Sequence, residues 1–224
     1  MSKDEIIILD CILSPFCMRV KIALNEKGVS YESKEEDLFG WKGGKSELLL
    51  KSNPIHKKVP VLLHNGNPLN ESSNIVTYID ETWPSSSPLL PSSPYERARA
   101  RFWIDYIDKK VFETGGKIWR SNGDEQEAAK KEFIEILKQL EEALGDNDFF
   151  GGERFGIVDV IAIPFSCWFY AFEKVGGFKV EEHCPKLSNW EKRCLLKESV
   201  GSVIPSPDMV YGFVSSMRNK LGLE

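Results

Sequence analysis

The segment Ser14-Pro15-Phe16-Cys17 follows closely on a short apolar run and carries two side chains capable of chemistry, a serine hydroxyl and a thiol. Serine is a favoured N-cap residue and proline suits the first helical position, so a helix is expected to begin here. A helix N-terminus offers N–H groups without intrahelical partners and the positive end of the helix dipole. Such a place lowers the pKa of a thiol. Two interpretations are therefore open: the segment is a site for a thiolate, or Ser14 only caps the helix.

Two further clusters combine charged and hydroxyl side chains. Lys57-Lys58-Val59-Pro60-Val61 places two lysines before a Val-Pro bond. Only about 5–6% of X-Pro bonds in folded proteins are cis, so composition alone favours the trans form. Glu71-Ser72-Ser73 stands at a second predicted helix start, where capping is again the simpler interpretation.

The elements that would position these clusters alternate between strand and helix. The predicted order is a strand over 6–9, a helix over 14–28, a strand over 29–34, a glycine-rich loop through 44, strands over 59–63 and 68–69, and a helix over 71–79. Asn65-Gly66 favours a hairpin between the last two strands, because both positions accept positive φ. This β-α-β-β-β-α order predicts an α/β domain at the N-terminus.

A linker and a helical region follow. Residues 84–94 contain four prolines and five serines, a composition typical of a linker. Helical periodicity then dominates, with helices predicted over 95–117, 124–144, 158–175, 187–196 and 208–221. The sequence thus predicts an N-terminal domain over 1–83, a linker over 84–94 and an all-α C-terminal domain over 95–224.

Composition argues against several classes of function. The 224 residues are 42% hydrophobic and carry a formal net charge of -5 without a basic face, so no nucleic-acid partner is expected. No apolar run approaches the roughly 18 residues of a membrane span, so we expect a cytosolic protein with no membrane partner. The five cysteines are odd in number and irregular in spacing, which predicts no disulfide framework. The three histidines are scattered, so no metal site is expected.

The three clusters together resemble the glutathione transferase superfamily, and blocks along nearly the whole chain resemble its plant tau class. These blocks are Ser-Pro-Phe-x-Met-Arg-Val beginning at Ser14, Asn53-Pro54-Ile55-His56-Lys57-Lys58-Val59-Pro60-Val61-Leu62, Glu71-Ser72, Tyr78-Ile79-Asp80-Glu81, Arg101-Phe102-Trp103, Ala128-Ala129-Lys130-Lys131-Glu132-Phe133, Phe150-Gly151-Gly152 and Cys184-Pro185-Lys186-Leu187. The resemblance implies a thioredoxin-like glutathione-binding domain followed by an all-helical domain with a hydrophobic substrate pocket. It also implies a homodimer that uses glutathione as co-substrate, with no other cofactor.

Ser14 matches the catalytic serine of the class. The resemblance implies that its hydroxyl donates a hydrogen bond to the glutathione sulfur and favours the thiolate. An ordinary thiol, with a pKa of about 8.5, is mostly protonated at neutral pH. The thiolate, and not the serine, would attack hydrophobic electrophiles, and organic hydroperoxides are a further implied substrate class.

The other glutathione-binding residues follow from the same match. Two lysines would hold the glycine carboxylate, a backbone strand edge would pair with the cysteinyl unit beside a cis proline, and a helix start would hold the γ-glutamyl end. In that order these residues are Lys45 and Lys58, Val59 and Pro60, and Glu71 and Ser72.

The resemblance implies an aromatic pocket for the electrophile, mainly in the helical domain. The residues that match it are Phe16, Phe112, Trp119, Trp168 and Phe213. Core packing is the alternative interpretation for each of them, because aromatic residues at helical spacing usually fill space.

Four features depart from the family pattern, and the first three concern the pocket and the loop before Lys45. Cys11-Ile12-Leu13 replaces aromatic residues before the serine, and Gly116 stands where a larger, often basic, side chain is expected. Both changes predict a roomier pocket. The loop through Gly40-Trp41-Lys42-Gly43-Gly44 is longer than usual, and its glycines loosen the expected placement of Lys45.

Cys17 replaces a glycine of the family one helical turn after Ser14, so both side chains would face a bound sulfur. A cysteine there could form a mixed disulfide with glutathione, which leaves a glutathione-dependent thiol–disulfide exchanger open as a second function. The alternative is a small side chain packed in the interior. A non-catalytic carrier of hydrophobic molecules is the third function.

Overall fold

The computed structural model describes residues 4–40, 43–84 and 88–223. The chain forms two compact units, Met1–Leu90 and Pro91–Glu224, called here the first and second unit. Their boundary falls within the segment 84–94 that was predicted as a linker. Residues 85–87 of that segment, and Trp41 and Lys42 of the predicted glycine-rich loop, lie outside the described residues.

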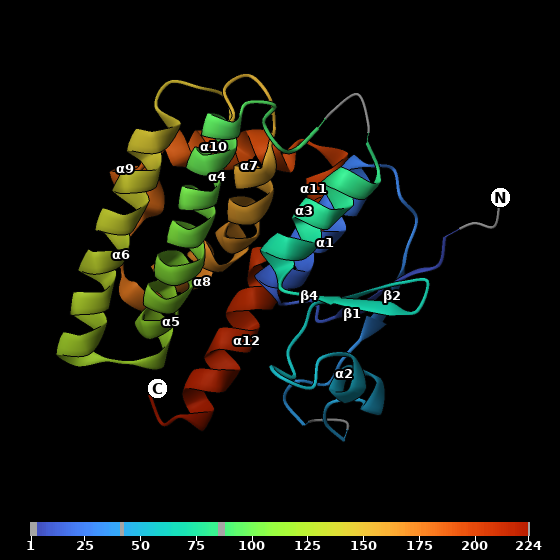
Figure 1. The fold of residues 1–224 in the computed structure, drawn as a ribbon. Coiled ribbons are helices and arrows are strands. Elements are labelled where there is room, and N and C mark those ends of the chain that lie inside the picture. Colours follow the sequence, from blue (N-terminus) through green and yellow to red (C-terminus); the bar gives the residue numbers. More distant parts are fainter. Residues whose placement is uncertain (1–3, 41–42, 85–87, 224) are drawn as a thin grey trace. The chain divides into compact units, whose positions relative to one another are not determined.

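A four-stranded mixed sheet organises the first unit (Figure 1). Its strands are β1 (Ile6–Asp10), β2 (Glu32–Glu35), β3 (Val61–His64) and β4 (Asn67–Asn70), in the spatial order β2-β1-β3-β4. Strands β1 and β2 are parallel, whereas β1 with β3 and β3 with β4 are antiparallel. The predicted thioredoxin-like α/β fold is thus confirmed.

Three helices pack on this sheet. Helices α1 (Pro15–Glu26) and α3 (Ser72–Thr82) lie side by side on one side of it, and α2 (Glu47–Ser52) lies on the other (Figure 1). Alternating strand residues serve the two faces. Ile7 and Leu9 cluster with Leu49 of α2, while Ile8 belongs to the opposite face of β1 and is fully buried.

The predicted hairpin is confirmed, whereas one helix was missed and one strand begins later than predicted. Asn65 and Gly66 have φ values of 51° and 79°, as their sequence required. Helix α2 was not predicted, because six residues with three consecutive leucines show no helical period. Strand β2 begins at Glu32 rather than at 29, and its four residues are polar and exposed at the sheet edge.

The second unit is helical, as predicted. Its helices are α4 (Pro94–Tyr106), a π-helix η1 (Ile107–Val111), α5 (Phe112–Arg120), α6 (Gly123–Leu144), α7 (Ile157–Ala162), a 3-10 helix η2 (Ile163–Phe165), α8 (Ser166–Gly176), α9 (Val180–His183), α10 (Pro185–Leu195), α11 (Glu198–Gly201) and α12 (Pro207–Lys220). The predicted helix over 158–175 is interrupted at Pro164, which cannot donate a helical N–H. The four-residue helices α9 and α11 were not predicted.

Aromatic packing and one buried carboxylate hold the second unit together. Phe133 is fully buried and meets the rings of Phe172 and Phe178 edge-on, at centroid distances of 5.5 and 6.4 Å. Asp159 is fully buried and accepts hydrogen bonds from the N–H of Gly156 at 2.9 Å and from Trp190 Nε1 at 2.7 Å. These bonds fix the start of α7 against α10.

Candidate functional site

Ser14 occupies the N-cap of α1, with φ −80° and ψ 113°. Its Oγ accepts a hydrogen bond from the N–H of Cys17 at 3.3 Å, and its own N–H donates to the carbonyl of Cys11 at 2.8 Å. Capping therefore uses a lone pair of the hydroxyl oxygen and not the hydroxyl proton. The capping interpretation and a donor role for Ser14 are compatible, because they use different parts of one hydroxyl group.

The Cys17 thiol lies beside this hydroxyl but is fully buried. Burial, followed by the negative charge of Asp10, raises the pKa of Cys17 well above its ordinary value, against a smaller opposing effect of a hydrogen bond with the Ser14 side chain. A neutral buried thiol is a poor nucleophile. This environment agrees with the interpretation of Cys17 as a packed side chain.

Arg19 links the starts of α1 and α3. Its side chain is fully buried, its Nη1 donates to the Ser72 hydroxyl at 3.0 Å, and its guanidinium carbon lies 4.9 Å from the centre of the Phe16 ring. No role for Arg19 was predicted from the sequence. The signal that could have found it is a basic residue among the apolar positions of the predicted helix, where a buried charge needs partners.

Glu71 immediately precedes α3 and has a positive φ of 69°. Its side chain makes no capping hydrogen bond, so the capping interpretation is wrong for this residue. The carboxylate is exposed, with Oε1 3.8 Å from His56 Nε2. Positive φ in a non-glycine residue costs about 1–3 kcal/mol and persists only where the surroundings hold it.

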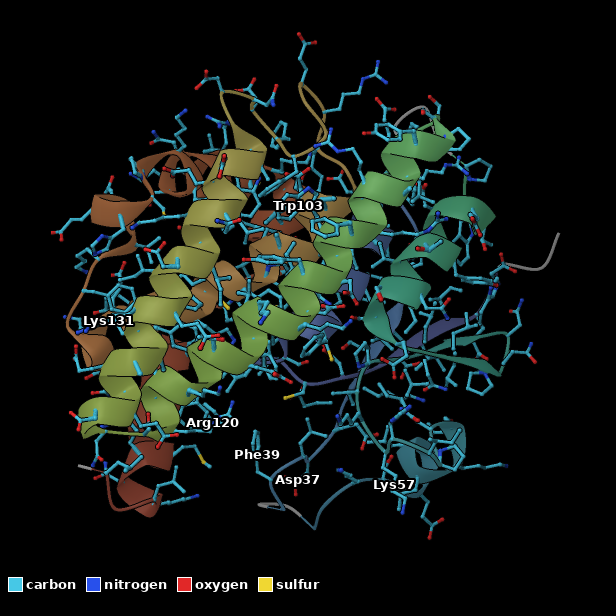
Figure 2. All side chains as sticks on the ribbon, turned by 60° about the vertical axis from the view of Figure 1, so that its left-hand side comes forward. Asp37, Phe39, Lys57, Trp103, Arg120 and Lys131 are labelled. Atoms are coloured by element: carbon cyan, nitrogen blue, oxygen red, sulfur yellow. The ribbon has the colours of Figure 1, made fainter. Side chains whose placement is uncertain are left out.

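Lys45 is exposed and lies between two anchored residues. On one side the N–H of Gly44 donates to Asp37, labelled in Figure 2, at 2.9 Å. On the other side Ser46 donates from its N–H and its hydroxyl to the buried Glu36 carboxylate, at 3.0 and 2.6 Å. These carboxylates restrict the backbone around Lys45 despite the glycines that precede it.

Asn53 shapes the turn that leads to Lys58. Its Nδ2 donates to the carbonyl of Lys58 at 3.0 Å, and its Oδ1 accepts from the N–H of His56 at 3.2 Å. Lys57, labelled in Figure 2, has a positive φ of 53° within this turn. The Val59-Pro60 bond that follows is cis, as the family resemblance implied and composition alone did not.

Three aromatic side chains predicted for the electrophile pocket meet in the second unit. Trp119 stacks on Trp168 at a centroid distance of 6.5 Å, and Phe213 lies 6.4 and 6.0 Å from these two rings. We call Trp119, Trp168 and Phe213 the ring cluster. Phe112 packs against Phe165 at 6.1 Å. Phe16 belongs to the first unit, where it contacts Arg19.

Arg218 holds the backbone beneath the ring cluster. It is buried, and its Nη1 donates to the carbonyls of Trp119 and Ser121 at 2.9 and 3.2 Å. Its Nη2 donates to the carbonyl of Leu223 at 3.1 Å. A cation at the C-terminal end of α5 also complements the helix dipole.

The described ranges 4–40, 43–84 and 88–223 contain neither a metal-binding cluster nor a helix that could cross a membrane. No group of three or more histidine, cysteine or acidic side chains able to hold a metal ion occurs there. No helix in these ranges combines the length and the apolar character that a membrane crossing requires. All five cysteines are free thiols and buried.

Comparison with known proteins decides the family. Residues 9–87 match the glutathione S-transferase N-terminal domain, and residues 104–198 match the C-terminal domain. The probable glutathione S-transferase parA of Nicotiana tabacum is 52% identical over 223 residues, and both chains are fully covered. Glutathione S-transferase U25 of Arabidopsis thaliana is 54% identical over 221 residues, covering 99% of this chain and 98% of that protein. The chain belongs to the glutathione S-transferase family.

Solved structures of glutathione S-transferases agree with this assignment. Rice GST1, solved in complex with glutathione, has a TM-score of 0.93 at 47% identity, covering 98% of this chain and 99% of that one. The tau class glutathione S-transferase of mango has a TM-score of 0.89 at 40% identity, covering 95% and 98%. The resemblance to the tau class is thus confirmed, and the chain is a glutathione transferase enzyme.

In this glutathione transferase, some residues of the candidate site in the first unit were predicted from sequence motifs, and others were found only in the structure. The motifs named Ser14, Lys58 and Ser72. The structure adds two residues that position members of this set. Arg19 donates to the Ser72 hydroxyl, and Asn53 donates to the Lys58 carbonyl. Both supporting residues lie inside quoted motif blocks, but their partners depend on the folded chain.

Proposed function

We propose that the enzyme binds glutathione on its first unit and uses the Ser14 hydroxyl to stabilise the glutathione thiolate, which then attacks hydrophobic electrophiles. The observation that carries this proposal is the N-cap geometry of Ser14, in which the Cys17 N–H engages the hydroxyl oxygen. The hydroxyl proton is not consumed by capping. Lowering a thiol pKa by about two units corresponds to roughly 2.7 kcal/mol of preference for the anion.

The remaining contacts of glutathione are proposed from the charges around Ser14. The exposed lysines Lys45 and Lys58 would bind the glycine carboxylate, and the backbone of Val59, next to cis Pro60, would pair with the cysteinyl unit. At the start of α3, Glu71 would bind the γ-glutamyl ammonium and the Ser72 N–H its carboxylate. The buried Arg19 supports the carboxylate site, because its positive charge lies against the Ser72 hydroxyl.

The electrophile is proposed to lie against aromatic side chains of the second unit. The half-buried rings of Trp168 and Phe213 offer polarizable apolar surface beside the buried Trp119, and Phe112 of the same unit is proposed to border the pocket. We thus propose that the domain over 1–83 binds glutathione and that the domain over 95–224 binds the electrophile. A peroxidase activity on organic hydroperoxides and a homodimeric state are proposed from the sequence resemblance to the tau class, and a cytosolic location from apolar runs that are too short for a membrane span.

Variants of Ser14 test the proposal, because capping and hydrogen-bond donation can be separated. Glycine is nearly as good an N-cap as serine, whereas alanine is poor. If the hydroxyl stabilises the thiolate, S14G and S14A both lower kcat/KM by at least about tenfold. S14T keeps a hydroxyl and retains activity. The thiolate absorbance of the binary complex, titrated against pH, reports the pKa of the bound thiol directly.

Two results would reject the assignment to Ser14. One is an unchanged pKa of the bound thiol in S14G. The other is an activity that follows the thermal stability of the variants, with S14G active and S14A inactive, because that pattern belongs to a mere cap. Disulfide exchange through Cys17 is disfavoured by the full burial and raised pKa of its thiol.

A further inference from the structure

The last residue of α5, Arg120, folds back over Gly116 one turn earlier. Its Nε donates to the Gly116 carbonyl at 3.0 Å. A Cβ atom at Gly116 would lie 1.9 Å from Arg120 Nη2, so the guanidinium fills the space that a side chain at 116 would need. The glycine was expected to leave the pocket roomier. In the structure this space holds a positive charge.

The same guanidinium lies on the ring cluster. Its central carbon is 5.1 Å from the centre of the Trp119 ring, within cation–π range, and Trp119 in turn stacks on Trp168. Figure 2 labels Arg120 where it ends α5. A planar cation is thus held at the edge of an aromatic surface by one hydrogen bond and one ring contact.

In and beside the ring cluster, one cation has no acidic partner and one indole N–H has no hydrogen bond among the described residues. In the described part of the second unit, no carboxylate forms an ion pair with Arg120, whose side chain is largely exposed. The indole N–H of Trp168 is buried and has no hydrogen-bond partner among the described residues. A buried donor without a partner is costly, so a ligand acceptor that meets it would be favoured.

We propose that Arg120 is a specificity-determining residue that binds the carboxylate of aromatic electrophiles whose ring lies on Trp119 and Trp168. This inference rests on the proposed role of the ring cluster as the electrophile pocket. Arg120 Nε donates to the Gly116 carbonyl, whereas its two terminal nitrogens form no hydrogen bond with the described residues, and a guanidinium matches a carboxylate through such paired donors. Gly116 is needed for this placement, because any larger side chain would displace the guanidinium.

A matched pair of substrates tests the charge. Para-chlorodinitrobenzoate carries a carboxylate, and the corresponding benzamide is neutral and nearly isosteric. In both reactions the glutathione thiolate forms a C–S bond at the carbon that bears chlorine, the C–Cl bond breaks and chloride leaves, while the thiol proton has gone to solvent. The ratio of kcat/KM for the benzoate to that for the benzamide isolates recognition of the carboxylate from chemistry at the sulfur.

The variant R120Q should lower this ratio about three- to fivefold, the effect of one exposed ion pair. Added salt should shrink the difference between wild type and R120Q, because screening weakens the pair. K117Q removes an equal charge from an exposed residue of the same helix and serves as the matched control. Its ratio should equal that of the wild type.

G116A provides an independent route to the same result. The added methyl meets the flexible end of Arg120, which must move away while its charge remains. G116A should therefore lower the ratio as R120Q does, and the double variant should show no further loss. This variant also keeps the test decisive if R120Q folds poorly.

An unchanged ratio in R120Q and G116A, or an equal fall in K117Q, would overturn the assignment of Arg120. Failure of the proposed function looks different, because S14G would then turn over the neutral benzamide as fast as the wild type does. If the wild type turns over neither compound, quenching of tryptophan fluorescence by each compound measures binding instead. Equal affinities for the benzoate and the benzamide would then also overturn the inference.

Discussion

Asp80 is predicted to be a principal stabilising residue of the first unit. One carboxylate oxygen accepts the N–H of Leu89 at 2.8 Å and the other accepts the N–H of Leu90 at 3.0 Å. The same carboxylate pairs with the ammonium group of Lys27, whose side chain has no solvent exposure. Asp80 thereby ties the end of α1 and the end of the unit to α3.

The loss of stability expected for the substitution D80N follows from these contacts. Asparagine keeps the shape but offers a single acceptor, so one of the two backbone N–H groups loses its partner, at about 1–3 kcal/mol. Lys27 loses a buried counter-charge, and breaking such a pair typically costs about 3–5 kcal/mol. Because both effects act at one site and partly overlap, we expect about 3–5 kcal/mol in all. Domains are stable by roughly 5–15 kcal/mol, so the loss is a large fraction.

Urea unfolding followed by circular dichroism measures the effect, and a double-mutant cycle with K27M identifies its source. In the K27M background, D80N should cost only about 1–3 kcal/mol, the share of the lost backbone acceptor. Equal losses with and without Lys27 would show that the ion pair does not matter. A loss below about 1 kcal/mol in D80N would refute the whole reasoning.

Two further predictions concern the second unit. Burial raises the pKa of Glu191 from 4.5 to about 7, so its contribution to stability is present below pH 4.5 and lost as the pH rises to about 7. The free energy of unfolding of E191Q should therefore equal that of the wild type near pH 4.5 and exceed it by about 2–3 kcal/mol near pH 8. Urea titrations at both pH values measure this difference, and an equal difference at both would contradict the raised pKa of Glu191. A Cβ at Gly115 would lie 2.5 Å from Phe172, so G115A should lower the melting temperature and cost about 1–2 kcal/mol. G116A, which meets only the flexible end of Arg120, should change stability by less than about 1 kcal/mol; a reversed order would be inconsistent with the packing around Phe172.

Local chemistry made part of the fold predictable from the sequence. The hairpin at Asn65-Gly66 and the helix start at Ser14-Pro15 follow from backbone preferences that neighbours in sequence decide. Helix α2 was missed because its six residues are ordered by the Glu36–Ser46 contact and by burial of Leu49, not by a periodic pattern. The π-helix η1 was missed because its apolar spacing resembles that of the α-helices on either side.

The candidate site shows the same division between local and tertiary information. Motif blocks placed Ser14 and Glu71 at helix starts, but the positive φ of Glu71 and the bond from Arg19 to Ser72 depend on how α1 and α3 pack together. Arg120 is a different case. Its contact with Gly116 spans only four residues of one helix, so a glycine one turn before a long cation was a signal already present in the sequence.

If the proposed function holds, serine at position 14 and the burial of Cys17 have the same electrostatic effect, because both avoid a second negative charge beside the glutathione thiolate. An alcohol keeps its proton at neutral pH, so Ser14 can donate to a ligand sulfur without adding negative charge beside it. A thiolate at Cys17 would repel the glutathione thiolate, and burial together with the Asp10 charge keeps Cys17 protonated by raising its pKa. The only sulfur that this helix start favours as an anion is then the one that glutathione brings.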